Sequence, residues 1–111
     1  RYISWSSENR SQLIRIPAAE GEYRRAELRS PDPLCNPYLA FTLLIRAGLA
    51  GLHEGKELPP PADLNLYTAP PEITAAYGLL PENLAQARQA AKDSAFVAES
   101  LPAALIRHYI Q

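Results

Sequence analysis

Two short runs of alternating residues near the start of the chain constrain its fold more than any other feature. The runs Gln12–Pro17 and Arg24–Ser30 change side-chain character from one residue to the next, and Ala18–Tyr23 separates them. Alternation with a period of two is typical of a half-buried strand, and a connection of this length containing Gly21 is typical of a hairpin. The sequence therefore predicts two antiparallel strands joined by a loop.

The second run carries a cluster of charge on one face of this hairpin. Arg25, Glu27 and Arg29 lie two residues apart, so a strand directs them to the same side. In the first run, Arg15 falls on the same face if the register allows, and Arg10 lies just before the hairpin. The predicted face combines one carboxylate with several guanidinium groups.

Two interpretations fit this face. It is either a solvated, salt-bridged strand that binds nothing, as is usual for surface charge, or a binding site. In the second case Glu27 is a metal ligand and the arginines bind an anion that the metal also contacts, because one carboxylate cannot satisfy so many cations. The cations are all arginine, the side chain suited to bidentate capture of phosphate or carboxylate.

The residues after the hairpin predict helices. Asn36 and Pro37 suit the N-cap and the first position of a helix, and the residues that follow are apolar on almost all sides, as in a mostly buried helix. His53 falls in the last turn of this helix, where the helix dipole favours a cation, so its place needs no ligand role. Further helices are expected within residues 81–111.

Residues 55–80 are rich in proline and show no sustained periodicity, although they include apolar residues such as Leu64 and Leu66. A structureless loop of this length is uncommon in a compact domain. We therefore expect an arm that packs on a surface outside this chain or on a neighbouring subunit.

The composition excludes several classes of partner. A formal net charge of −1 argues against general electrostatic binding to nucleic acid or to an anionic membrane, and no apolar run is long enough to span a bilayer. The single cysteine, Cys35, excludes an internal disulfide and fits a reducing compartment, so we expect a cytoplasmic location. The chain of 111 residues has the size of one domain and contains no methionine, which favours a piece of a longer protein.

Four segments of the chain resemble a known family. They are NRSQLIRIP at residues 9–17, YRRAELRSPDP at 23–33, CNPYLAFTLLIRAGLAGL at 35–52 and NLY at 65–67. In this order they are similar to the C-terminal part of the catalytic domain of a bacterial-type glutamine synthetase, over about Ser4 to Tyr67. The resemblance implies an ATP-dependent glutamate–ammonia ligase that makes glutamine through a γ-glutamyl phosphate intermediate.

The resemblance also implies roles for the charged residues. Arg10 would approach the transferred phosphoryl group and Arg29 would steady glutamate and its phosphorylated intermediate, so both are candidate catalytic and glutamate-binding residues. Arg15 and Arg25 would contact the ATP phosphates. Glu27 would bind the metal, and oxygen and arginine chemistry favours Mg²⁺ or Mn²⁺.

Tyr67 matches a position that some bacterial members expose for adenylylation. Here Thr68 follows it, where regulated members commonly carry an acidic residue. We therefore favour an unmodified tyrosine that packs against other residues.

The patterns and the resemblance together predict an α+β fold. Its parts are active-site strands at residues 1–33, a buried helix at 36–54, the proline-rich arm at 55–80 and C-terminal helices at 81–111. The strands would form a hairpin or a small antiparallel sheet within the larger active-site barrel of the family.

The resemblance covers only about the last quarter of a family member. Members draw their other metal ligands from upstream sequence, complete each active site with the neighbouring subunit and assemble as large rings. We therefore expect a homo-oligomer of the full-length protein and an inactive chain when these 111 residues stand alone. Two other functions stay open: a γ-glutamyl ligase that uses a larger amine, such as a polyamine, and a non-catalytic module that binds anions or docks a partner.

Overall fold

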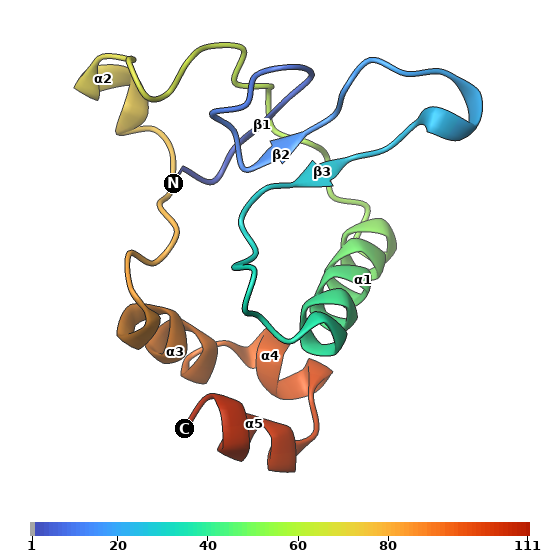
Figure 1. Ribbon diagram of the computed structural model, residues 1–111, viewed down its shortest axis with the longest axis vertical. Helices are drawn as coiled ribbons and strands as arrows, with labels where there is room; N and C mark the ends of the chain where they lie inside the picture. Colours follow the sequence, from blue (N-terminus) through green and yellow to red (C-terminus); the bar gives the residue numbers. More distant parts are fainter. Residues whose placement is uncertain (1) are drawn as a thin grey trace. The chain divides into compact units, whose positions relative to one another are not determined.

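The structure is a computed structural model that describes residues 2–111, and the chain divides into two units. The first unit contains the N-terminal residues up to Asp32 together with Pro59–Leu80. The second contains Pro33–Leu58 and Pro81–Gln111. Figure 1 labels the helices and strands of both units. All the predicted site residues belong to the first unit.

A three-stranded sheet, in the order β1-β2-β3, forms the centre of the first unit. β1 (Trp5–Ser6) pairs parallel with β2 (Ile14–Arg15), and β2 pairs antiparallel with β3 (Glu27–Leu28). The predicted hairpin is confirmed, although its strands are shorter than the alternating runs. The sheet is mixed, however, so the expectation of a wholly antiparallel sheet is wrong at β1.

A polar turn connects the two parallel strands. Asn9 Oδ1 accepts hydrogen bonds from the backbone N–H and from the hydroxyl of Ser11, both at 2.9 Å. The Asn9 N–H donates to Ser6 Oγ at 3.0 Å. Neighbouring strands with a short connection are usually antiparallel, and local bonds of this kind mark a turn without encoding the strand direction. The parallel pairing could therefore not be predicted from these residues.

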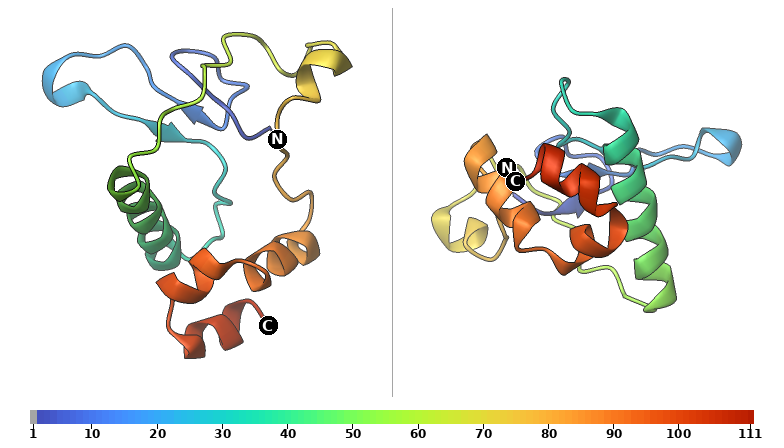
Figure 2. Two further views of the ribbon diagram at one scale, coloured as in Figure 1. Left: turned by 180° about the vertical axis from the view of Figure 1, so that it is seen from behind. Right: turned by 90° about the horizontal axis from the view of Figure 1, so that it is seen from below.

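The loop between β2 and β3 extends away from the sheet in both orientations (Figures 1 and 2). It contains a short 3-10 helix, η1 (Gly21–Tyr23). Gly21 has a φ of 58°, which a residue with a Cβ atom rarely adopts. The glycine therefore permits the turn that the hairpin loop requires.

The proline-rich segment packs against the strands of its own chain. Ala62 and Leu66 are buried, and the side chain of the fully buried Gln12 donates from Nε2 to Ala62 O at 2.7 Å and to Leu64 O at 2.9 Å. Residues 62–66 therefore pack on their own chain, whereas Tyr67, Ile73 and Leu79 stay exposed and their expected cover stays a prediction. The apolar residues of this segment meet a buried amide whose partners the sequence does not reveal.

Both ends of this segment are attached near β1. Trp5 Nε1 donates to Pro59 O at 2.8 Å, and the Ile3 N–H donates to Gly78 O at 2.7 Å. Between these points lies α2 (Pro71–Thr74), a one-turn helix that the sequence analysis did not predict. The segment is thus attached to the N-terminal residues at Pro59, at residues 62–66 and at Gly78.

Helices form the second unit. They are α1 (Pro37–His53), α3 (Leu84–Lys92), α4 (Ala95–Ser100) and α5 (Ala103–Tyr109). Asn36 caps α1 as predicted, because its Oδ1 accepts from the N–H groups of Tyr38 at 2.9 Å and Leu39 at 3.3 Å. α4 packs against α1 and against α3, as Figure 2 shows.

The burial of α1 stays a prediction for the longer protein, because within the described residues the helix is largely exposed. None of its side chains is buried, and Tyr38, Phe41, Ile45 and Leu52 are among the large apolar residues that it exposes. The helix is apolar on almost all sides, whereas the other helices of this unit contact only part of its surface. Within residues 2–111, no helix combines the length and the apolar character that crossing a membrane requires.

Candidate functional site

Charged side chains gather on one face of the β2–β3 hairpin. The register sets Arg15 directly opposite Glu27. Arg15 Nε donates to Glu27 Oε2 and Arg15 Nη2 donates to Oε1, each at 2.9 Å, which is the bidentate geometry of a guanidinium on a carboxylate. Arg25 Nη2 adds a bond to Oε1 at 3.2 Å. The structure thus brings three of the predicted site residues together, and we call the face formed by Arg15, Arg25, Glu27 and Arg29 the charged face.

The members of this cluster differ in exposure. The side chains of Arg15, Glu27 and Arg25 are 15%, 28% and 53% exposed. Arg15 is therefore fixed by its surroundings as well as by its carboxylate partner. Arg25 gives one of its five N–H donors to Glu27, so its other donors are available to an anion from solvent.

The guanidinium groups hold Glu27 in its ionised form. The hydrogen bond from Arg15 has the largest effect on the pKa of Glu27 and lowers it below the usual 4.5. Desolvation opposes this shift, and Arg25 adds to it. Glu27 is therefore a carboxylate at neutral pH, which is the form that a metal ligand or an ion pair requires.

The lowered pKa predicts how this ion pair contributes to stability as the pH changes. A group with a lower pKa in the folded than in the unfolded state stabilises the fold above its unfolded pKa, and this contribution is lost as the pH falls through the folded pKa. We expect Glu27→Gln to lower the urea midpoint at neutral pH, and the difference from the wild type to shrink as the pH falls below about 4.5.

The urea midpoint would be measured over this pH range for the wild type, for Glu27→Gln and for the control Glu22→Gln. Glu22 lies exposed in η1, so its substitution should leave the pH dependence of the midpoint unchanged. A Glu27→Gln difference that grows in acid would contradict the ion pair.

Arg29 and Arg10 occupy different places. The Arg29 N–H donates to Leu13 O at 2.9 Å, which continues the β2–β3 ladder and sets Arg29 on the same face as Glu27. Its Nε atom is buried. Arg10 lies exposed in the turn between β1 and β2, and its guanidinium has no hydrogen-bond or ion-pair partner within residues 2–111. Arg29 is therefore part of the charged face, whereas Arg10 lies outside the ion-paired cluster.

The charged face offers one possible metal ligand. In the part of the chain that the structure describes, no three His, Cys, Asp or Glu side chains come together as a metal site. Glu27 Oε1 already accepts from both guanidinium groups, whereas Oε2 accepts only from Arg15 and has a second lone pair. Mg²⁺ takes about six oxygen ligands. These residues therefore fit a metal only as the source of a single ligand.

Tyr67 does not pack into the core of the first unit. It is 68% exposed, and its backbone N–H donates to Asn65 Oδ1 at 3.0 Å. An unmodified, packed tyrosine therefore stays a prediction, and residues outside the described part of the chain would have to cover its side chain.

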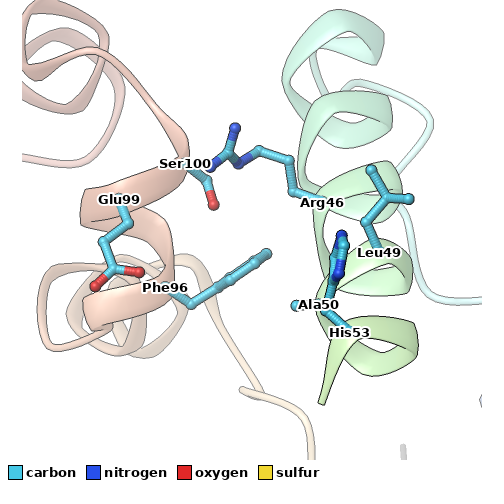
Figure 3. A pocket seen from close by; sticks show the side chains of 7 residues that line it. All are labelled: Arg46, Leu49, Ala50, His53, Phe96, Glu99 and Ser100. Carbon is cyan, nitrogen blue, oxygen red and sulfur yellow. The ribbon is translucent and has the colours of Figure 1, made fainter. Parts of the chain in front are cut away.

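Hollows also lie between helices of the second unit. One, of about 290 Å³, lies between α1 and α4. Figure 3 shows that Arg46 and Phe96 extend toward it from opposite walls. The Glu99 carboxylate points away from α1. A mainly apolar hollow of about 650 Å³ is lined in part by Cys35 and Tyr109. Neither hollow includes a residue of the charged face.

The comparisons with known proteins agree on one family. A family model described as the catalytic domain of glutamine synthetase matches residues 1–111, which is the whole chain. The chain belongs to the glutamine synthetase family.

Individual glutamine synthetases support this assignment. The glutamine synthetase of Methanosarcina mazei is 45% identical over 111 residues, covering 98% of this chain and 25% of that protein. The one from Thermus thermophilus is 39% identical, with 98% and 25% covered, and the one from Mycobacterium tuberculosis is 44% identical, with 88% and 23% covered. The chain therefore spans about a quarter of the length of the curated glutamine synthetases that it matches.

Buried polar residues in and beside the turn between β1 and β2 were not predicted from the sequence. Ser6, Ser11 and Gln12 are all buried. The one available signal was a glutamine within an alternating run, because a buried side chain amide needs hydrogen-bond partners. The carbonyl partners of Gln12 lie 50 positions away at Ala62 and 52 positions away at Leu64, so no local pattern predicts them.

Proposed function

We propose that the protein containing this chain is an ATP-dependent glutamate–ammonia ligase that makes glutamine through γ-glutamyl phosphate. The bidentate pairing of Arg15 with Glu27, with Arg25 beside it, carries the proposal, because it occurs in a chain of the glutamine synthetase family. The shared name of the relatives supports the same product.

The chemistry of the reaction explains why arginines suit this site. The γ-carboxylate of glutamate is a poor electrophile, so it must first be activated. One of its oxygens attacks the γ-phosphorus of ATP, the bond from that phosphorus to the β–γ bridging oxygen breaks, and ADP leaves. Ammonia then attacks the acyl carbon, phosphate leaves with the oxygen that joined it to glutamate, and a proton is released from the new amide nitrogen.

The first step brings two anions together, and fixed cations lower its barrier by neutralising the charge that develops. Arg25, with its accessible donors, and Arg15 would contact the ATP phosphates. Arg29 would hold the glutamate γ-carboxylate. Arg10 would approach the transferred phosphoryl group, for which all the donors of its exposed guanidinium are available within the described residues.

Glu27 would give one ligand to Mg²⁺ or Mn²⁺, and residues outside this chain would give the others. Such a cation, when bound, neutralises part of the charge on the ATP phosphates. Arg15 orients the carboxylate through two hydrogen bonds and keeps it ionised. The role of Arg15 is therefore to prepare Glu27 as well as to contact phosphate.

The full-length protein would act as a homo-oligomer. The exposed apolar side chains of α1, such as Phe41 and Ile45, form a surface that the rest of the protein or another copy would cover. The resemblance to ring-forming enzymes supports the same expectation.

A specific observation favours one alternative. Glu27 is already engaged by Arg15 and Arg25, as expected for a purely structural ion pair. In that case the chain would be a non-catalytic module that binds anions or docks a partner. A larger amine in place of ammonia would instead keep the mechanism and change the acceptor.

Phosphate release by the full-length protein separates these functions. With ATP, glutamate and ammonia, we expect phosphate and glutamine in equal amounts. Release only with a larger amine would identify a γ-glutamyl ligase for that amine, and no release with any amine would support the non-catalytic module. The 111-residue chain alone serves as a control, and we expect it to form no glutamine because its charged face offers one metal ligand, Glu27.

A further inference from the structure

We propose that Gln12 is a positioning residue whose buried amide fastens the turn carrying Arg10 to residues 62–66. The catalytic consequence rests on the proposed function, since it needs Arg10 to act on the phosphoryl group. The structural part stands on the contacts of Gln12 and of its neighbour Ser11.

Both ends of the Gln12 side chain have partners, and the residue is 0% exposed. Nε2 donates to Ala62 O at 2.7 Å and to Leu64 O at 2.9 Å. Oε1 accepts from the hydroxyl of Ser4. A buried amide that is satisfied at both ends is held in a single orientation, because any rotation would leave buried polar atoms without partners.

Ser11 extends this contact on the other side of the turn. Its Oγ accepts from the Leu66 N–H at 3.0 Å and donates to Asn9 Oδ1 at 2.9 Å. The neighbouring side chains of Ser11 and Gln12 therefore bind the backbone of residues 62–66. Ser11 and Gln12 also belong to the turn that carries Arg10. Movement of one segment requires movement of the other.

The residues before and after Arg10 in the sequence are held by hydrogen bonds. Asn9 is bonded to Ser6 on one side, and Ser11 and Gln12 are bonded to residues 62–66 on the other. The guanidinium of Arg10 has no partner within the described residues, so its location depends on the backbone of the turn. A displacement of about 1 Å in a catalytic group can lower a rate by about 10²-fold. The network therefore sets Arg10 relative to the strands that carry Glu27.

Gln12→Met in the full-length protein tests this role, since methionine keeps the length of the side chain and removes both hydrogen-bonding ends. We expect kcat for phosphate release to fall by about 10- to 100-fold, with little change in KM for ATP. Ser4→Ala is the comparison variant: it removes the partner of Oε1 and keeps the Nε2 bonds to Ala62 O and Leu64 O, so its loss of kcat should be clearly smaller than that of Gln12→Met. An unchanged kcat in Gln12→Met, or the same loss in both variants, would overturn the proposal.

Hydrogen exchange gives a readout that does not depend on turnover. The Leu66 N–H should exchange slowly in the wild type, and Gln12→Met should speed exchange in residues 9–13 and 62–66 together, whereas Ser4→Ala should have a clearly smaller effect. Faster exchange at 62–66 with an unchanged turn would contradict the coupling. If the wild type shows no turnover, but Gln12→Met speeds exchange in residues 9–13 and 62–66 together, the proposed function would be rejected. The link between these two segments would still be supported.

If Gln12→Met does not fold, a second variant and a measurement on the wild type replace it. Gln12→Asn then replaces it, because the shorter amide cannot reach both carbonyls, and the same two measurements apply. Rapid exchange of the Leu66 N–H in the wild type would by itself overturn the proposal.

Discussion

Glu27→Ala in the full-length protein should reduce glutamine formation by about 10²- to 10³-fold, a loss comparable to removing one charge-stabilising group from an active site. The variant removes the only carboxylate of the charged face and leaves Arg15 without either acceptor atom. The matched control is Glu22→Ala, an exposed glutamate of the same hairpin loop, which should keep the wild-type rate. Phosphate release with ATP, glutamate and ammonia gives both rates.

The dependence of the rate on metal concentration distinguishes a ligand from a structural ion pair. If Glu27 is a ligand, the variant should need more Mg²⁺ or Mn²⁺ to reach half of its maximal rate. If Glu27 only stabilises the hairpin, the folded variant should turn over at the wild-type rate and unfold at lower urea concentration. That second outcome would remove Glu27 from the proposed site.

Arg15→Lys should lower kcat/KM for ATP by about 10- to 100-fold although it conserves the charge. An ammonium cannot reproduce two parallel N–H bonds from Nε and Nη2 to the two oxygens of Glu27. The variant should also raise the pKa of Glu27, because the hydrogen bond from Arg15 is the largest influence that lowers it.

Arg24→Lys is the control for this substitution. Arg24 adjoins Arg25 in sequence, is exposed, and follows η1 before β3 begins. It should therefore tolerate lysine with an unchanged kcat/KM. Equal kinetics of Arg15→Lys and the wild type would show that the bidentate geometry has no role in catalysis.

The hairpin and its charged side could be predicted because local rules determine them. Alternation with a period of two indicates which side chains share a face. Arg15 and Glu27 then lie opposite each other in one of the strand registers that the connecting loop permits, and this is the register observed. The N-cap of α1 followed from Asn36 and Pro37 for the same reason.

The features that could not be predicted depend on contacts between distant parts of the chain. Gln12 bonds to Ala62 and Leu64, and these bonds hold a segment whose composition suggested an arm directed elsewhere. The exposure of α1 has a different cause. The apolar residues of a helix indicate that its surface needs to be covered. They do not indicate whether the covering residues belong to the same 111 residues.

The fate of the γ-carboxylate oxygen of glutamate tests the central claim most directly. Glutamate carrying a heavy oxygen isotope in this group would be incubated with ATP, ammonia and the full-length protein, and the phosphate would be analysed by mass spectrometry. Formation of γ-glutamyl phosphate predicts one heavy oxygen in the phosphate for each glutamine made, because phosphate leaves with the oxygen that joined it to glutamate. Phosphate without the heavy isotope would contradict the acyl phosphate, and with it the role proposed for the charged face.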